Sequence, residues 1–447
     1  MLISFSVENF LSFKEKIDFS MVAFSERQHN NRVAVIKKYP LKVLPIAAIY
    51  GGNASGKSSF IKALSFAQNY VVTGLAPDLG IPRSAFRLDS AMLEKPSRFE
   101  FSLLINDLIF EYSFTVDSAS VLSETLKEIN SSSEKILFDR QGSTIKFPDI
   151  RNTQILNFVA KGTRDNVLFL TNSVWQKVEL FKPVYNWFRN RLQIITPTSR
   201  FIPVDQLFNE SNPLSQSVAK MLRRLDTGID HLEGQRVELE SVLNNEGDRA
   251  QLLSEIKEGQ SVTYRKDSQV YVITKVNGKL QSKRLVALHN DKNGQPVCFG
   301  LHEESDGNNR LINLIPAFFQ LTNEESEDVF VFDELDRSLH PLLTRTLIES
   351  FLEQCTKTSR AQMIFTTHDL SLMSQEIFRR DELWVAERNN IGGSRLYSFS
   401  DYELRKDKDI RKSYLEGRLG GVPNILGVVR NSGWGNWYDQ ENVFFFK

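Results

Sequence analysis

One short stretch, Gly51–Ser58 (GGNASGKS), restricts what this chain can fold into more than any other feature. An apolar run from Leu44 to Tyr50 precedes it and predicts a buried strand. A helical pattern follows it, with one apolar face made of Phe60, Ile61, Leu64 and Ala67. In this strand, loop and helix context, the pattern G-x-x-x-x-G-K-S predicts a loop that holds phosphate groups.

The residue types of this loop suit an anion. Glycines let backbone N–H groups converge without interference from Cβ atoms, and the start of a helix adds partial positive charge. We expect Lys57 to reach the β- and γ-phosphates of a nucleotide and the Ser58 hydroxyl to bind Mg²⁺. The predicted nucleotide-binding residues are Gly51, Asn53, Ala54, Ser55, Gly56, Lys57, Ser58 and Ser59.

Composition sets wider bounds. A chain of 447 residues predicts two or three structural units. Its 55 Lys and Arg residues equal its 55 Asp and Glu residues, so nucleic acid could be contacted only through a local patch. Two isolated cysteines, Cys298 and Cys355, are typical of a reduced cytoplasmic protein without a metal cluster. We find no signal-peptide pattern and no apolar span long enough for a membrane, so no membrane partner is expected.

The first half of the chain predicts a β-rich region followed by helices. Residues 2–24 alternate as two strands joined by Asn9–Phe13, and residues 99–116 form a hairpin with Asn106-Asp107 as its turn. Short strands within 124–138 and 144–147 would complete an antiparallel sheet. Residues 152–191 are predicted to be mostly helical, with their aromatic side chains in the core.

The middle of the chain predicts helix over residues 214–256, interrupted at 226–228 and 244–247, without the heptads of a coiled coil. A hairpin over 261–276 with an Asn277-Gly278 turn follows. Its basic residues could contact nucleic acid, although a solvated face is the favoured interpretation because no binding stripe is formed. These residues are Arg265, Lys266, Lys275, Lys279, Lys283 and Arg284.

A second group of polar residues follows two apolar runs near the end of the chain. The run Val329–Phe332 ends in Asp333 and Glu334, at the strand end where open α/β sheets bind ligands. Asp333 is predicted to hold Mg²⁺ through water, and Glu334 to polarise an attacking water. The run Met363–Thr367 ends at His368. A lone histidine is more often structural, but in this position we interpret it as a sensor of the γ-phosphate.

Upstream of the acidic pair, Glu304–Arg310 opens a helical pattern over Leu311–Leu321. Ser305 and Gly307 at a helix start can offer a hydroxyl and N–H groups to a phosphate. The segment Asp336–Pro341 follows the acidic pair directly.

This order of motifs resembles the ATPase heads of the ABC type. It is similar in particular to a soluble group related to the overcoming-lysogenisation-defect (OLD) proteins and RloA, and more distantly to SMC and Rad50. The likeness rests on the strand pair at Asn9-Phe10, on the loop and signature motifs, on Leu335–Pro341, and on Tyr414–Gly421.

The resemblance implies an α/β fold: an ABC-type P-loop ATPase head with an antiparallel β subdomain and a helical and β insertion. It implies domains at 1–200, 201–290 and 291–447, with ATP and Mg²⁺ as cofactors and Ser58 and Asp333 at the metal. Two copies would associate around sandwiched ATP. Ser305, Asp306, Gly307 and Arg310 would form the signature motif, which completes the nucleotide site of a partner copy (in trans). Asp336 and Ser338 would belong to the D-loop. Glu334 and His368 would be the catalytic residues.

Several positions depart from the family pattern. Asp306 replaces the glycine of transporters, Asn308 replaces a usual threonine, and Leu11 stands where SMC-like heads are often basic. Gln176 is the candidate for the Q-loop. OLD nucleases continue into a Toprim domain, but only 79 residues follow His368 here. We interpret the acids among them as scattered solvated groups: Glu387, Asp401, Asp407 and Asp409.

The leading hypothesis is a regulatory ATPase of a bacterial anti-phage system that controls a separate effector such as a nuclease, as in PARIS-type systems. The alternatives are a DNA-repair ATPase of the SMC or RecF kind and a non-enzymatic scaffold that holds ATP. Aromatics in Gly433–Tyr438 could anchor the effector, or fold back on the head.

Overall fold

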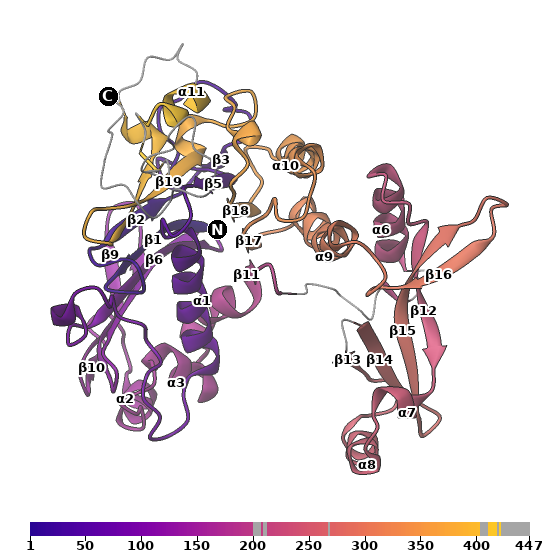
Figure 1. Ribbon diagram of the computed structural model, residues 1–447. Helices are drawn as coiled ribbons and strands as arrows, with labels where there is room; N and C mark the ends of the chain where they lie inside the picture. Colours follow the sequence, from indigo (N-terminus) through magenta and orange to yellow (C-terminus); the bar gives the residue numbers. More distant parts are fainter. Residues whose placement is uncertain (200–206, 209–211, 267–268, 403–409, 418–419, 422–447) are drawn as a thin grey trace, which may run out of the picture. The chain divides into compact units, whose positions relative to one another are not determined.

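The computed structural model describes residues 1–199, 207–208, 212–266, 269–402, 410–417 and 420–421 (Figure 1). The chain forms two compact units that alternate along the sequence. Unit 1 takes Met1, 29–46 and 186–365, and unit 2 takes 2–28, 47–185 and the described residues from 366 onward. The predicted domain limits at residues 200 and 290 stay predictions. The aromatic segment Gly433–Tyr438, with Asp407 and Asp409, lies outside the described residues.

An antiparallel sheet forms much of unit 2. Its strands lie in the order β10-β9-β8-β7-β6-β1-β2. The predicted strand pair in residues 2–24 is confirmed, since Phe5 pairs with Phe19. The predicted turn is also confirmed, because Asn106 and Asp107 both have positive φ and join β6 to β7. The strands are β1 (Leu2–Glu8), β2 (Ile17–Ser20), β6 (Ser97–Ile105), β7 (Leu108–Val116), β8 (Val121–Ile129), β9 (Glu134–Gln141) and β10 (Thr144–Lys146).

Helix α1 (Lys57–Thr73) packs on this sheet through aromatic rings. The Phe60 ring centroid lies 5.6 Å from that of Phe5 and 5.0 Å from that of Phe19. One turn and a half further along, the Phe66 ring lies 5.2 Å from that of Phe99. Full burial of such a side chain stabilises the folded state by about 2–3 kcal/mol. These contacts hold the first turn of α1, and therefore the glycine loop before it, at a fixed place on the sheet.

The strand that leads into the glycine loop belongs to a second layer of unit 2. Strand β5 (Ile46–Tyr50) is fully buried and runs parallel to β19 (Leu383–Arg388), with Ala48 opposite Leu383. Strand β20 (Ser394–Ser398) adds antiparallel to β19. A continuous apolar run is what a parallel strand buried on both faces requires, as the sequence of β5 predicts.

Short helices complete unit 2, and the predicted helical character of residues 152–191 is confirmed. The first group is η1 (Ser90–Met92), α2 (Gln154–Lys161), α3 (Phe169–Trp175), η2 (Glu179–Phe181) and α4 (Lys182–Asn186). The π-helical turn η3 (Trp187–Arg191), which follows α4 directly, belongs to unit 1. The second group is η4 (Leu370–Leu372), η5 (Arg380–Glu382), η6 (Phe399–Asp401) and α11 (Ile410–Leu415).

Unit 1 contains the strands that the acidic pair and the histidine follow. Strands β11 (Leu192–Ile195), β17 (Val329–Phe332) and β18 (Gln362–Thr366) run parallel in that order. Helix α9 (Asp306–Leu321) precedes β17, and α10 (Pro341–Gln354) connects β17 to β18. The hairpin β3 (Ala34–Ile36) and β4 (Leu41–Val43) also belongs to this unit. The two predicted apolar strands and the helix over Leu311–Leu321 are confirmed.

A separate sheet with three helices lies within unit 1, and it corrects one prediction. Residues 231–237 were expected to be helical but form β12 (His231–Val237), antiparallel to β15 (Lys279–Asn290). The predicted Asn277-Gly278 turn exists and joins β14 (Gln269–Val276) to β15, while residues 261–276 divide between β13 (Ser261–Lys266) and β14. Strand β16 (Pro296–Gly300) pairs with β15. The helices are α6 (Pro213–Arg224), α7 (Leu239–Val242) and α8 (Glu246–Glu255).

The error over β12 has a physical cause. Val237 is the one strong β-former of this segment, and its Glu, Gln and Arg residues favour helix in isolation. Pairing along the whole of β12 with β15 overrides that preference, and it buries Leu232 beside the buried Ala287. Strand β15, the partner of β12, lies some fifty residues downstream, so the local sequence pattern does not predict the pairing.

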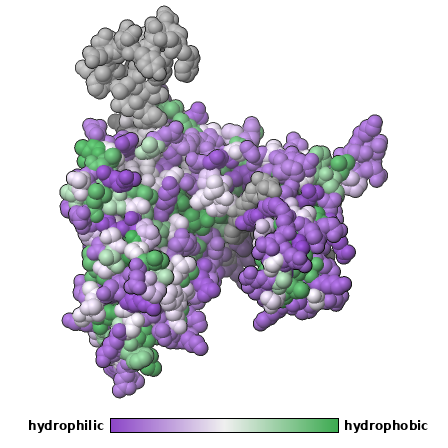
Figure 2. Space-filling model, turned by 60° about the horizontal axis from the view of Figure 1, so that its bottom comes forward, coloured by the Kyte–Doolittle hydropathy of each residue, from purple (hydrophilic) through white to green (hydrophobic). Residues whose placement is uncertain are grey.

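The fold class is α/β, as predicted: parallel strands with helices, a large antiparallel sheet, and an insertion of sheet and helices. Hydrophilic residues cover most of the face shown in Figure 2, and hydrophobic residues appear there in small groups. Within the described part of the chain, no helix combines the length and the apolar character needed to cross a membrane.

Candidate functional site

The glycine loop has the backbone shape of a phosphate cradle. Gly51 and Gly56 have φ of 149° and 112°, values that residues with a Cβ rarely adopt. A Cβ on Gly51 would overlap the carbonyl oxygen of Ala386, so the loop passes directly over the end of β19. Gly56 is the N-cap of α1, and no side chain accepts a hydrogen bond there. The start of α1 thus lacks a capping side chain at Gly56, and a helix start of this kind favours an anion.

Two buried side chains complete this loop. Lys57 is 6% exposed, and its ammonium Nζ donates to the carbonyl oxygens of Gly51 and Gly52 at 2.7 and 3.0 Å. The hydroxyl of Ser55 is buried without a hydrogen-bond partner in the described structure. A buried cation beside a hydroxyl with unused hydrogen-bonding capacity fits the charge and the acceptors of a nucleotide phosphate chain. Asn53 and Ala54 are exposed, while Ser58 and Ser59 are half-buried at the start of α1.

His368 lies beyond β18, in unit 2. The N–H of Thr367 donates to the carbonyl of Ile49 at 3.1 Å, so this segment runs beside the strand that leads into the glycine loop. His368 itself is exposed. Gln176, the Q-loop candidate, is exposed at the end of α3, and Leu11 is half-buried with a positive φ.

In unit 1, the acidic pair occupies a strained turn after β17. Asp333 is 8% exposed, and its N–H donates to the carbonyl of Ile195 at 2.9 Å. Glu334 has a φ of 49°, and its carboxylate accepts a hydrogen bond from Arg337 at 3.3 Å. A non-glycine residue in this conformation costs about 1–3 kcal/mol and persists only where its surroundings enforce it, a situation concentrated at functional sites.

Arg310 supplies that enforcement. Its guanidinium, on α9, donates to the carbonyl oxygens of Thr196, Asp333 and Glu334 at 3.4, 3.4 and 3.1 Å. Burial lowers the pKa of Arg310 from its ordinary value, while the nearby acids oppose that shift. The guanidinium thus clamps the backbone of the acidic turn to the end of β11. The sequence marked Arg310 for a role in trans, which stays a prediction; its contact with the acidic turn could not be read from spacing.

The predicted signature and D-loop residues lie together in unit 1. Ser305 caps α9 by accepting a hydrogen bond from the N–H of Asn308 at 3.1 Å. A Cβ on Gly307 would stand only 2.9 Å from the carbonyl oxygen of Ser338, so glycine permits the close approach of the two segments. Asp306, Arg310 and Ser338 line a cavity of about 500 Å³, together with Pro197, Thr198, Ser199, Leu301, His302, Glu304, Asn309, Asn313 and Arg337.

The start of α9 is also tied to the inserted sheet. The carboxylate of Glu304 is hydrogen-bonded to His289 of β15 at 2.6 Å and accepts from the Asn308 amide at 2.8 Å. The same amide donates to the carbonyl of Thr227, in the connection between α6 and β12. These contacts join the signature segment to residues for which the sequence suggested no role.

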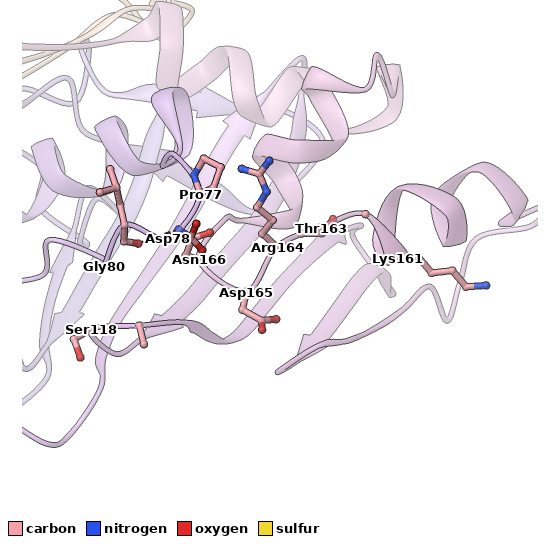
Figure 3. Close-up of a pocket in the computed structure, with 12 residues that line it drawn as sticks. Pro77, Asp78, Gly80, Ser118, Lys161, Thr163, Arg164, Asp165 and Asn166 are labelled. Atoms are coloured by element: carbon pink, nitrogen blue, oxygen red, sulfur yellow. Dashed lines mark hydrogen bonds between the residues drawn. The ribbon is translucent and has the colours of Figure 1, made fainter.

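A second cavity, of about 670 Å³, lies in unit 2 away from the glycine loop (Figure 3). Its lining mixes acids and bases, including Asp78, Lys161, Arg164 and Asp165. The Asn166 amide closes the wall by donating to two carbonyls of the segment 76–79. None of the predicted site residues lines this cavity.

The described residues were searched for groups of side chains that could hold a metal ion. Among the described residues, no group of three or more His, Cys, Asp or Glu side chains could hold a metal by itself. Mg²⁺ is usually held by one or two protein oxygens together with substrate phosphates and water. Ser58 and Asp333 stay the predicted protein oxygens for such an ion.

Comparison with known proteins places this site in a family. Residues 46–374 match the family described as "AAA domain, putative AbiEii toxin, Type IV TA system". The chain belongs to this family. The matched span of the AAA domain begins at β5 and ends after His368, so it includes every predicted site residue. A search of curated proteins finds no match.

Among solved structures, the AAA-domain chain is similar to the SMC head domain from Thermotoga maritima, at 14% identity and a TM-score of 0.34, over 89% of this chain and 98% of that one. It is also similar to an SMC head bound to the C-terminal winged-helix domain of ScpA, at 10% identity and a TM-score of 0.36, over 89% and 97% of the two chains.

We expect Lys57→Ala to weaken ATP binding by on the order of 10²–10³-fold, because removal of one buried charge leaves the phosphates without their partner. Isothermal titration calorimetry measures this affinity. Lys62→Ala, on the exposed face of the same helix, is the matched control and should bind ATP as the wild type does. Unchanged affinity in Lys57→Ala would reject the phosphate-loop assignment.

Proposed function

We propose that this AAA-domain protein is an ATP-hydrolysing switch that regulates a separate effector in a bacterial anti-phage, or abortive-infection, system. One observation carries the nucleotide part: a buried lysine and a glycine loop stand at the uncapped start of a long helix. In that arrangement Lys57 and the first N–H groups of α1 bind the phosphates, and Ser58 offers its hydroxyl to Mg²⁺.

Hydrolysis is assigned to the acidic turn of unit 1. Glu334 acts as the general base toward water, and Asp333 is the oxygen ligand for Mg²⁺, which would stabilise charge on the phosphates. Arg310 supports this role, because its hydrogen bonds to the two backbone carbonyls fix the direction of the Glu334 side chain. His368 is assigned to sensing the γ-phosphate.

Self-association follows from the position of Ser305 and Gly307. They stand at the first turn of α9, whose N–H groups and Ser305 hydroxyl suit a phosphate of a second copy. Two copies related by a two-fold axis would then share two nucleotides, with Asp336 and Ser338 beside each shared site. Closing with ATP and opening after hydrolysis makes the nucleotide a conformational switch.

The defence role rests on the family description, which names a putative toxin of the AbiEii type. A separate effector is proposed because the two described acids named above among the residues after His368, Glu387 and Asp401, are poor candidates for a nuclease centre. Glu387 accepts hydrogen bonds from Tyr397 and from the N–H of Gly421, and the Asp401 carboxylate accepts from the N–H of Ser398, the N-cap of η6. Glu387 is therefore a structural acceptor, and its expected solvated role is corrected.

The alternative of a DNA-repair ATPase finds less support. Three of the six basic residues on the inserted sheet hold structural hydrogen bonds: Lys266 to Ser241 and Asn244, Lys275 to Leu253, and Arg284 to Gln235. Side chains engaged in this way are poorly placed to follow a phosphate backbone.

Glu334→Gln should retain ATP binding and slow hydrolysis by about 10²- to 10⁴-fold, since an amide cannot take the proton from water. Release of phosphate and nucleotide affinity are measured on the same preparation. Glu325→Gln, exposed in the connection before β17, is the control. Near-normal turnover in Glu334→Gln would move the general base to another residue.

Ser305→Arg should leave ATP binding by one protomer intact and block hydrolysis, because the long cation would occupy the place of the partner's phosphate. A mixture with Lys57→Ala should regain activity, up to about a quarter of the wild-type rate, since each mixed dimer holds one site free of both substitutions. Ser254→Arg, exposed on α8, controls for the added charge. A mixture no more active than either parent would contradict sites shared between two copies.

The purified protein should hydrolyse ATP and cleave neither DNA nor RNA with Mg²⁺ or Mn²⁺. Two-metal cleavage needs clustered carboxylates around ions about 4 Å apart, and the described residues contain no such cluster. In cells, protection from phage should require a neighbouring effector gene and should be lost with Lys57→Ala. Cleavage of nucleic acid by this chain alone would overturn the separation of switch and effector.

A further inference from the structure

A segment from the end of the described chain contacts the phosphate loop. The carbonyl oxygen of Gly421 accepts a hydrogen bond from the N–H of Gly52 at 2.9 Å. The hydroxyl of Tyr414, on α11, donates to the same carbonyl at 3.0 Å. Tyr414 is 4% exposed, so its ring is anchored in the core of unit 2. We name the residues Tyr414, Gly420 and Gly421 the glycine clasp.

The other side of the clasp is held by a carboxylate. Glu387, near the end of β19, accepts from the N–H of Gly421 at 3.2 Å and from the hydroxyl of Tyr397 at 2.7 Å. Tyr397 comes from the neighbouring strand β20. Burial and the bond to Glu387 raise the pKa of Tyr397, which keeps its hydroxyl a donor. Gly421 is thus fixed through both its N–H and its carbonyl.

Two residues of the glycine clasp, Gly420 and Gly421, occupy positions where only glycine fits. Gly420 and Gly421 have φ of 66° and 68°. A Cβ on Gly421 would overlap the side chain of Val385, and one on Gly420 would overlap the hydroxyl of Tyr397. Gly51 is held equally close to the carbonyl of Ala386. The phosphate loop and the clasp therefore pack against the same end of β19, with no room for a side chain on either.

One peptide group joins the clasp to Lys57. The N–H of Gly52 and the carbonyl of Gly51 belong to the same planar unit and point in opposite directions. The N–H binds the Gly421 carbonyl, while the Gly51 carbonyl accepts the Lys57 ammonium at 2.7 Å. Rotation of this peptide would break both bonds together, so the clasp sets the orientation of a carbonyl on which the ammonium rests.

We propose that the glycine clasp and Glu387 are positioning residues of the nucleotide site, which hold the Gly51–Gly52 peptide so that Lys57 is placed for the phosphates of ATP. The proposal rests on the proposed function of the loop. Without the clasp the peptide is free to rotate, and ATP binding must first order it. The loss is therefore expected in affinity for ATP and in KM, while kcat changes little.

The test compares Gly421→Ala with Gly417→Ala in the full chain. Gly417 lies in the same segment with a similar φ of 73°, but no atom stands within 4 Å of where its Cβ would be. Both changes introduce the same backbone strain, and only the first disrupts the clasp. We expect Gly421→Ala to weaken ATP binding and raise KM by about tenfold, and Gly417→Ala to change them less than about twofold.

Tyr414→Phe is a milder substitution, because it removes only one hydroxyl. The variant protein should fold even if Gly421→Ala does not. It should raise KM for ATP by about two- to fivefold. Hydrogen–deuterium exchange gives a readout independent of nucleotide: a peptide containing Gly52 should exchange faster in both variants, while one from β6 and β7 should not change.

Wild-type affinity for ATP in both Gly421→Ala and Tyr414→Phe, with unchanged exchange at Gly52, would overturn the proposal, as would an equal defect in Gly417→Ala. If the wild type binds no ATP, the proposed function fails. Hydrogen exchange at Gly52 then decides by itself whether the clasp holds the Gly51–Gly52 peptide. Faster exchange there in the two variants supports the clasp, and unchanged exchange rejects it.

Discussion

The buried ammonium of Lys57 is the group on which the arrangement of unit 2 depends. Burial of a charge is costly unless hydrogen bonds replace its water shell. Here two carbonyls of the preceding loop supply these bonds, which forces the loop to fold back over the first turn of α1. That turn is held in place by aromatic packing on the antiparallel sheet. The position of the loop therefore depends on the packing of α1 against the sheet as well as on the residues of the loop itself.

Sequence patterns were informative wherever the determining interaction is local. The apolar run of β17 and the turn residues Asn106-Asp107 specify their own conformations, and both were found. The candidate site residues could be proposed for the same reason, since each motif lies on consecutive residues. Their assembly with one another is a separate matter that spacing does not decide.

What the sequence did not reveal depends on partners distant along the chain. Strand β12 is specified by β15, and Glu387 acquires its role only from Tyr397 and Gly421. Arg310 shows the same limit, because its position on a helix face is visible in sequence while the carbonyls it clamps are not. The chain also passes several times between the two units, and no change in amino-acid composition marks the positions where it does so.

The parallel pairing of β5 with β19 has a consequence for how the protein is made. The glycine loop is synthesised long before β19, the strand beside β5, and before Gly421, whose carbonyl binds the N–H of Gly52. Pairing between such distant segments is slow and can begin only when both have been synthesised. An incomplete chain therefore carries the loop sequence without the neighbours that shape it. The glycine loop therefore reaches its final shape only after β19 and the segment that includes Gly421 have been synthesised.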